Sequence, residues 1–179
     1  MNYETLQIEQ GDINIVSHGG LALIGQAIQR YTHLSRELDT LIPLRHGTKH
    51  SDILKTYTAM PCLGKNDFEA INTLENALYF MTAIGLKELL SEPTLRQRMN
   101  KQAKNFLPFV EKASLDFLSN SQPTLTSVST GHLPIDADVT PMDNSGSHKE
   151  GVSHTYKDYD GYAPMAAYLG QEGYCLASE

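Results

Sequence analysis

Residues 135–145 read IDADVTPMDNS, and the start of this stretch decides the fold. Ala137 and Val139 alternate with Asp136 and Asp138, and successive side chains of a strand point to opposite faces. The alternation therefore predicts a strand that presents two carboxylates on one face and apolar side chains on the other.

Asp136 and Asp138 lie in the part of the sequence that is richest in candidate ligands for a hard cation. Mg²⁺ takes few protein carboxylates and completes its shell with water and substrate phosphates. Two such ions can activate the attacking oxygen and stabilise the leaving oxygen in phosphoryl transfer. The local pattern also fits a polar strand face followed by an Asx-turn at Asp143-Asn144, and the pattern alone does not decide between the two.

The region around this strand predicts the first strands of a sheet. Strand-like segments cover residues 133–139, 163–169 and 174–179, and the residues GQEG at 170–173 predict a hairpin turn. Residues 119–131 are rich in Ser, Thr, Pro and Gln, so they predict an extended connection.

The sequence before this connection predicts helices, because apolar residues recur there at steps of three and four. The expected elements are a short strand over 7–16 and helices over 17–41 with a break near Thr32, 51–60, 67–78, and 92–118 with a kink or division at Pro108. Ser17, Ser51, Asn66-Asp67 and Ser91 are the expected N-caps. In the third helix we expect Phe68, Ile71, Leu74 and Leu78 to point inward.

Composition indicates a folded protein, with 40% hydrophobic and 20% charged residues among 179. No apolar stretch approaches the ~20 residues that span a bilayer, and the N-terminus lacks the pattern of a secretory signal. Cys62 and Cys175 are expected to be reduced, partly buried thiols of a cytosolic protein.

The net charge of −7 argues against a general nucleic-acid coat protein, because non-specific DNA affinity depends on many Lys and Arg residues. Residues 1–122 are near neutral, with 12 Lys and Arg against 13 Asp and Glu, whereas residues 123–179 carry a net charge of −6. The acidic excess is therefore concentrated in the predicted sheet.

Two groups of basic residues stand out in the sequence. The densest group lies on the last predicted helix and consists of Arg96, Arg98, Lys101 and Lys104, with Lys87 nearby. Such side chains can contact phosphates, but a solvated helix face is an open alternative. Lys149 and Lys157 lie between the first two predicted strands of the sheet. His148 and His154 are expected to be ordinary loop histidines.

Several longer motifs occur in a fixed order. They are SHGGLALIG (17–25), GKNDFEAI (64–71), SEPTLRQR (91–98), DADVTPMDNSG (136–146), KEGVSHTYK (149–157), DGYAP (160–164) and YLGQEGY (168–174). With these motifs the chain resembles bacterial insertion-sequence transposases of the DDE class, in the group-one subgroup. The resemblance extends from about Gln7 to Glu179.

This resemblance implies an α+β protein in which an all-helical N-terminal domain (1–122), expected to bind DNA or to dimerise, precedes the first strands of an RNase-H-like catalytic domain (123–179). It implies that Asp138, or the nearby Asp136, is the first acid of the D-D-E triad. The implied chemistry is Mg²⁺-assisted attack of water, and then of a 3′-hydroxyl, on DNA at the terminal inverted repeats. The implied setting is a homodimer in the bacterial cytoplasm. The resemblance also implies that the basic residues contact DNA, namely Arg96, Arg98, Lys101, Lys104, Lys149 and Lys157.

Length separates this chain from that family, whose members continue well beyond Glu179 and carry the second Asp and the Glu in the added part. We therefore expect a truncated N-terminal piece that is inactive alone. One alternative is a DNA-binding or dimerising module without catalysis. Another is a metal-dependent phosphohydrolase, because Asp136-Ala-Asp138-Val-Thr140 is similar to the D-x-D-x-T motif of haloacid-dehalogenase-like phosphatases.

Overall fold

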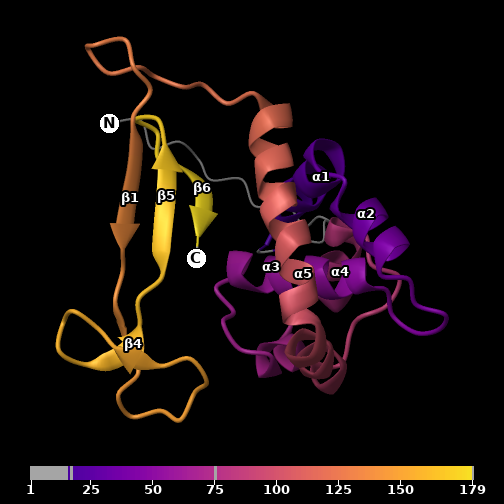
Figure 1. Ribbon diagram of the computed structural model, residues 1–179. Coiled ribbons are helices and arrows are strands. Elements are labelled where there is room, and N and C mark those ends of the chain that lie inside the picture. The colour runs from indigo at the N-terminus through magenta and orange to yellow at the C-terminus, as the bar shows by residue number, and fades with distance from the viewer. Residues whose placement is uncertain (1–15, 17, 75, 179) are drawn as a thin grey trace, which may run out of the picture.

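The computed structural model describes residue 16 and residues 18–74 and 76–178. The predicted strand at 7–16 and the cap at Ser17 lie outside the described residues, apart from Val16, which is not in a strand. Helices come first along the chain and strands follow, as Figure 1 shows. The fold class is therefore α+β, as the sequence predicts.

Within the described residues the helical part contains five α-helices and one 3₁₀ helix. They are α1 (Leu21–Tyr31), α2 (Leu34–Leu41), α3 (His50–Cys62), η1 (Glu69–Thr73), α4 (Ala77–Ile84) and α5 (Glu92–Ser121). The predicted break near Thr32 is confirmed, because Thr32 is extended and its hydroxyl donates a hydrogen bond of 2.7 Å to the Ile28 carbonyl. This bond ends α1 and lets the chain turn into α2.

Helix α5 begins as predicted, because the Ser91 hydroxyl accepts a hydrogen bond from the backbone N–H of Thr94. Pro108 neither ends nor divides the helix, which runs through 30 residues to Ser121. Gln122 then adopts a left-handed conformation, with φ of 48°. The extended connection therefore begins about three residues later than the sequence predicts.

Two expectations about the helices are wrong. Ser51 does not cap α3 but lies buried in its first turn, where its hydroxyl donates a 2.7 Å hydrogen bond to Asp39 of α2. Leu78 is 75% exposed, because left-handed Asn76 separates η1 from α4 and rotates the second piece. Ile71, in contrast, is buried as predicted.

The hydrophobic core lies within the helices. Every buried apolar side chain of the described residues falls between Leu21 and Ala113. Helices α1 and α4 cross at Gly25, where a Cβ would lie only 1.9 Å from the carbonyl oxygen of Ala83. Only glycine permits this backbone contact, so Gly25 sets how closely the two helices pack.

The strands form two small antiparallel sheets. The larger contains β1 (Ile135–Val139), β5 (Met165–Leu169) and β6 (Tyr174–Ser178) in the order β1-β5-β6, and the hairpin turn at 170–173 is confirmed. The smaller contains β2 (Met142–Asp143), β3 (Ser153–His154) and β4 (Asp160–Tyr162) in the order β2-β4-β3, and the sequence did not predict it. Its strands are too short to carry an alternating pattern.

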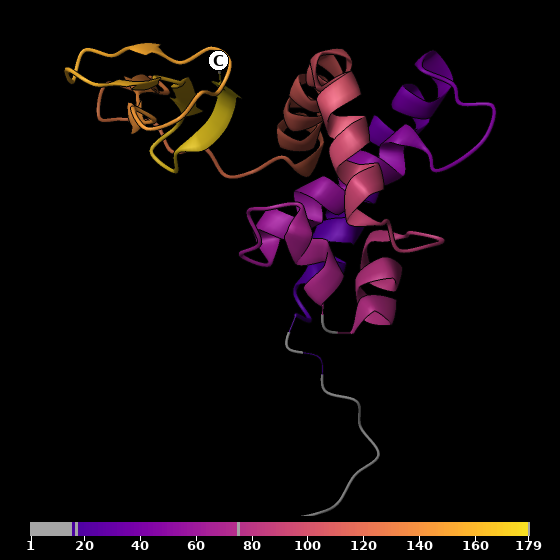
Figure 2. The same ribbon diagram turned by 90° about the horizontal axis from the view of Figure 1, so that it is seen from below.

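The extended connection joins the strands to the helices, and Figure 2 shows the sheets to one side of the helical part. The turn between β5 and β6 is fastened to this connection, since Glu172 accepts hydrogen bonds from the backbone N–H and hydroxyl of Thr126. Strand β6 lies next to α5, where Cys175 and Phe117 line the same apolar groove.

Both cysteines are free, and both are exposed rather than partly buried. Among the helices that the structure describes, none is long and apolar enough to cross a membrane.

Candidate functional site

Asp136 and Asp138 lie on the same face of β1, and both are exposed. In the antiparallel register Asp136 is opposite Tyr168 and Asp138 is opposite Ala166, so both carboxylates share a sheet face with these two residues of β5. Neither forms an ion pair with another described residue. Their oxygens are therefore free to accept ligands from solution.

These two carboxylates fit a magnesium ion by the chemistry of their donors, because Mg²⁺ prefers hard oxygen ligands and retains several waters. They form only part of a site, however. The described ranges contain no group of three or more His, Cys, Asp or Glu side chains that could hold a metal ion. Strand β1 thus offers two carboxylates, fewer than the three ligands of such a group.

Asp143 has a different role from the two strand aspartates. Its Oδ1 accepts hydrogen bonds from the Ser145 hydroxyl at 2.7 Å and from the Ser145 backbone N–H at 2.9 Å. These bonds lower the pKa of the Asp143 carboxyl, the hydroxyl contributing most. The predicted Asx-turn is confirmed, and Asp143 shapes the loop after β2.

The turn between β3 and β4 is held against the end of β1. The Tyr156 hydroxyl lies 3.5 Å from the Val139 carbonyl, and the Tyr159 hydroxyl donates a 3.1 Å hydrogen bond to the Pro141 carbonyl. The ammonium of Lys157 lies 5.4 Å from the centre of the Tyr156 ring. Lys157 therefore lies on a turn that contacts Val139, the residue directly after Asp138 in β1.

Lys149 is exposed in the loop between β2 and β3, where the Tyr162 hydroxyl donates a 2.7 Å hydrogen bond to the neighbouring Glu150 carbonyl. His148 is exposed in the same loop. His154 is in β3, where its ring nitrogens lie 3.2 Å from Asp160 and 3.9 Å from Asp158. All these side chains are exposed, but only His148 is a loop histidine as predicted, because His154 pairs with Asp160 in the small sheet.

Arg96 does not share a surface with the other basic residues of α5. Its guanidinium forms ion pairs with Glu92 and Glu69, and it stacks at 5.0 Å over the Phe68 ring. The hydrogen bond to Glu92 raises the pKa of the Arg96 guanidinium most strongly. Arg96 thus joins α5 to η1, and two carboxylates neutralise its charge.

Arg98 and Lys101 lie together on another side of α5. They line a pocket with Leu44 of the loop between α2 and α3, and Gln97 and Gln102 complete it. Lys104 is exposed on the next turn of the helix. The sequence identified these basic residues but gave no sign that the α2–α3 loop lies beside them.

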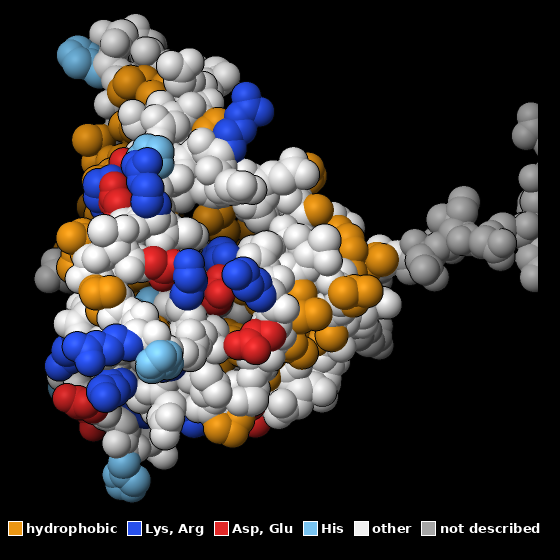
Figure 3. Space-filling view, turned by 90° about the vertical axis from the view of Figure 1, so that its right-hand side faces the viewer, with side chains coloured by type: hydrophobic (Ala, Val, Ile, Leu, Met, Phe, Trp, Pro, Cys, Tyr) orange, Lys and Arg blue, Asp and Glu red, His pale blue; other side chains and the backbone are white. Residues whose placement is uncertain are grey.

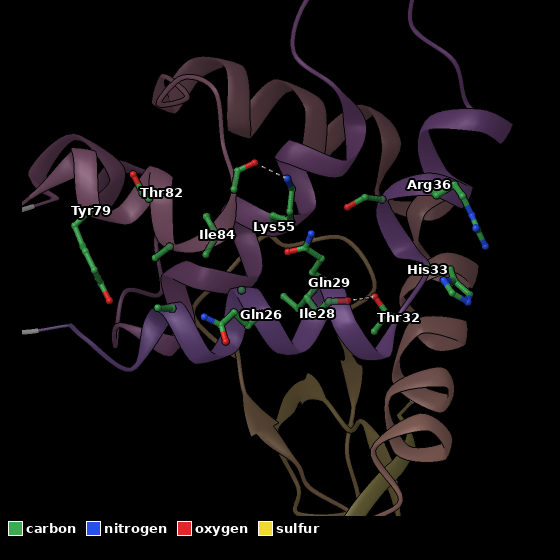
Figure 4. A pocket seen from close by; sticks show the side chains of 15 residues that line it. Gln26, Ile28, Gln29, Thr32, His33, Arg36, Lys55, Tyr79, Thr82 and Ile84 are labelled. Carbon is green, nitrogen blue, oxygen red and sulfur yellow. Dashed lines mark hydrogen bonds between the residues drawn. The ribbon is translucent and has the colours of Figure 1, made fainter.

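A larger pocket of about 590 Å³ lies between α1, α2 and α4, as Figure 4 shows. Gln26, Gln29, His33 and Arg36 contribute polar side chains to it, and no carboxylate lines it. Lys55 reaches it too, but its ammonium is engaged by the Gly85 carbonyl at 3.1 Å and by Asp52 at 2.8 Å. Because the described residues that line this pocket include no carboxylate and no residue of β1, the pocket is separate from the candidate metal site.

A comparison with known families identifies a family model that covers nearly the whole chain. The family model described as "Transposase DDE domain group 1" matches residues 2–179. The matched range includes every helix and strand that the structure describes. No curated protein and no solved structure matches the chain.

Proposed function

Because the chain belongs to the DDE transposase family, in its group 1, we propose that it takes part in metal-dependent cleavage and transfer of DNA strands when an insertion sequence moves. The observation that carries this proposal is the pair of exposed carboxylates on one face of β1. Acids on a strand face can bind the ions that activate phosphodiesters for attack.

We further propose that the strands are the beginning of an RNase-H-like sheet. The antiparallel order β1-β5-β6 after a helical part supports this, because the acid-bearing strand comes first in the chain. Asp138 would be the first acid of the triad and Asp136 its neighbour. Asp138 is the better candidate because it lies nearer the end of the strand, which the hydrogen bond from the Thr140 N–H to the Pro164 carbonyl fixes.

When bound, magnesium would supply the positive charge that polarises the phosphodiester and lowers the pKa of the attacking hydroxyl. The contribution of Asp138 is to hold the ion with one carboxylate while leaving its other positions to water and phosphate oxygens. One or two carboxylates cannot position two ions. We therefore propose that residues 1–179 alone do not turn over DNA and need the remaining acids of the triad.

DNA contacts would come from two regions. Lys157 lies on the turn that contacts the end of β1, and Lys149 lies on the loop between β2 and β3; both would contact the strand that is cleaved. On α5 the proposed contacts are Arg98, Lys101 and Lys104, and Arg96 would contribute least because Glu69 and Glu92 already neutralise it. The terminal inverted repeats are the proposed partner, bound by a homodimer. Sedimentation equilibrium with a repeat duplex would test the dimer.

Metal binding by β1 tests the proposal directly. Mn²⁺ replaces Mg²⁺ in such sites, and its electron paramagnetic resonance signal from free ions decreases on binding. We expect Asp138→Asn to abolish the strongest binding by the chain in the presence of DNA, and Asp136→Asn to weaken it. Asp158→Asn is the matched control, because this carboxylate is 99% exposed on the neighbouring turn. Equal binding by all three variants would exclude β1 as the metal site.

A second candidate function is DNA binding without catalysis, and the location of the core favours it. Every buried apolar side chain of the described residues lies between Leu21 and Ala113, in the helices or in the connection before α5, so the helical part has the packing that a stable DNA-binding surface needs. Fluorescence anisotropy with duplexes from the flanks of the gene, against scrambled duplexes, would test it. Sequence-selective binding without metal would support this function, and equal affinity for both duplexes would count against it.

A further inference from the structure

We propose that the loop over residues 42–49, between α2 and α3, joins Arg98 and Lys101 of α5 in one surface that binds the phosphate backbone of duplex DNA. This inference rests on the proposed function and names the part of the helices that would contact the duplex. Three kinds of observation carry it, namely the contacts of the loop with α5, the unbalanced charge of the surface, and the buried histidine beneath it.

The loop touches α5 at two points. Leu44 lines the pocket that contains Arg98 and Lys101. Gly47 has a φ of +90°, and a Cβ placed on it would lie 3.7 Å from a guanidinium nitrogen of Arg98. Arg45 and His46 stand between these two points, and both are exposed. The loop therefore carries two exposed basic residues between its two points of contact with α5, although it lies about fifty residues earlier in the chain.

Few carboxylates balance this surface. Lys49, at the end of the loop, lies 3.6 Å from Asp39. No described carboxylate forms an ion pair with Arg45, Arg98 or Lys101, whereas Arg96 and Lys112 each have two carboxylate partners. The one further carboxylate that contacts the loop among the described residues is Glu88, which accepts a 3.1 Å hydrogen bond from the Thr48 hydroxyl. Arg98 and Lys101 share a pocket without an ion-pair partner and repel each other, so an anionic ligand would stabilise their arrangement. The Gln97 and Gln102 amides in the same pocket can donate further hydrogen bonds to phosphate oxygens.

The distribution of charge also indicates how many phosphates could be bound. Figure 3 shows that the Lys and Arg side chains on this side of the molecule form several groups, some mixed with carboxylates, rather than one continuous stripe. A group of three to four cations would neutralise few phosphates. Binding should therefore show a shallow dependence on salt, with a slope of roughly −3 in a double-logarithmic plot.

His50 lies beneath this surface and would respond to its ligand. It is 2% exposed, and its ring packs edge-on against Phe106 at 5.2 Å. Burial and the nearby positive charge of Arg98 lower the pKa of His50. A phosphate on Arg98 would offset that charge, so binding should raise the pKa of His50. The proton resonance of its ring carbon therefore reports on Arg98 without any assay of activity.

The experiment measures binding of the full chain to a labelled DNA duplex across a range of salt concentrations. We expect Arg45→Gln, Arg98→Gln and Lys101→Gln each to reduce the salt slope by about 0.9 and to weaken binding about eightfold near 0.1 M salt. Lys101→Arg should retain binding, because it preserves the charge. Lys65→Gln removes a cation remote from this surface and should change neither quantity, and circular dichroism confirms that each variant is folded.

The outcomes separate this inference from the proposed function. If the duplex binds but none of the three glutamine variants changes the slope, the surface is wrong while DNA binding stands elsewhere. If the chain binds Mn²⁺ through Asp138 but binds no duplex, the surface is wrong and the metal site stands. A rise in the His50 pKa with duplex, and a smaller rise with inorganic phosphate, supports a backbone surface. An equal rise with both at matched phosphate concentration would indicate a site for single phosphates and overturn the duplex assignment.

Discussion

Asp39 of α2 accepts two hydrogen bonds from Ser51 in the first turn of α3, one from its backbone N–H at 3.1 Å and one from its hydroxyl at 2.7 Å. A side chain from another helix thus satisfies an N–H that has no partner within α3. The carboxylate also interacts favourably with the positive end of the helix dipole.

Asp39→Ala should therefore lower the free energy of unfolding by about 1–2 kcal/mol, since a capping acceptor of α3 is lost. Thermal unfolding followed by circular dichroism would measure it. Ser51→Ala should cost less, because the backbone hydrogen bond to Asp39 remains. Equal stability of Asp39→Ala and wild type would show that solvent replaces this cap at no cost.

Gly25→Ala should destabilise the protein, although alanine normally favours a helix by about 1 kcal/mol over glycine. The new Cβ would overlap the Ala83 carbonyl oxygen at 1.9 Å, so α1 and α4 would have to separate, at a cost of about 3 kcal/mol. Gly20→Ala is the matched control, because nothing lies within 4 Å of its Cβ position. Urea denaturation of both variants would show whether the close contact between α1 and α4 or the helix propensity of alanine has the larger effect on the free energy of unfolding.

His50 should make stability depend on pH in the weakly acidic range. Burial and Arg98 lower the pKa of folded His50 below the 6.5 of an unperturbed histidine. At pH values between the pKa of His50 in the folded chain and its pKa in the unfolded chain, the unfolded chain binds more protons. The free energy of unfolding therefore falls as the pH falls below about 6.5. His50→Gln should flatten the profile below about pH 6.5, and exposed His148→Gln should leave the slope unchanged. A slope that survives His50→Gln would assign it to another group.

Glu172→Ala should release the connection between α5 and β1. The Thr126 hydroxyl, more than its N–H, lowers the pKa of Glu172, which indicates that the ionised carboxylate makes this contact. Limited proteolysis should cut residues 122–134 faster in Glu172→Ala than in wild type. Glu150→Ala removes another exposed carboxylate and serves as the control. Identical cleavage rates would mean that Gln171, which donates to the Ser127 carbonyl, suffices to hold the turn.

The sequence predicts the elements that depend on local pattern. Helical periodicity locates α1, α2, α3 and α5, and the alternation around Asp136 and Asp138 locates β1. The turn at 170–173 needs only its two glycines, which adopt positive φ.

The remaining features depend on partners that are distant in the chain. The local sequence predicts that Ser51 is an N-cap, but in the structure its hydroxyl donates to Asp39. The local sequence likewise presents Arg96 as a basic residue free to bind an anion, but in the structure Glu69 and Glu92 neutralise its charge. The two-residue strands β2 and β3 exist only because β4 pairs with both. No local window of sequence contains these relationships.

The concentration of buried apolar side chains in the helices implies two levels of protection against hydrogen exchange. Amides of α3 and α5 are covered by the core and should exchange only through global opening. Amides of β1, an edge strand with an exposed face, should exchange through local opening at a much smaller free energy. Strand β1, which carries Asp136 and Asp138, would thus be the part of the molecule that changes conformation most readily. It could adjust its register or twist while the helices keep their shape.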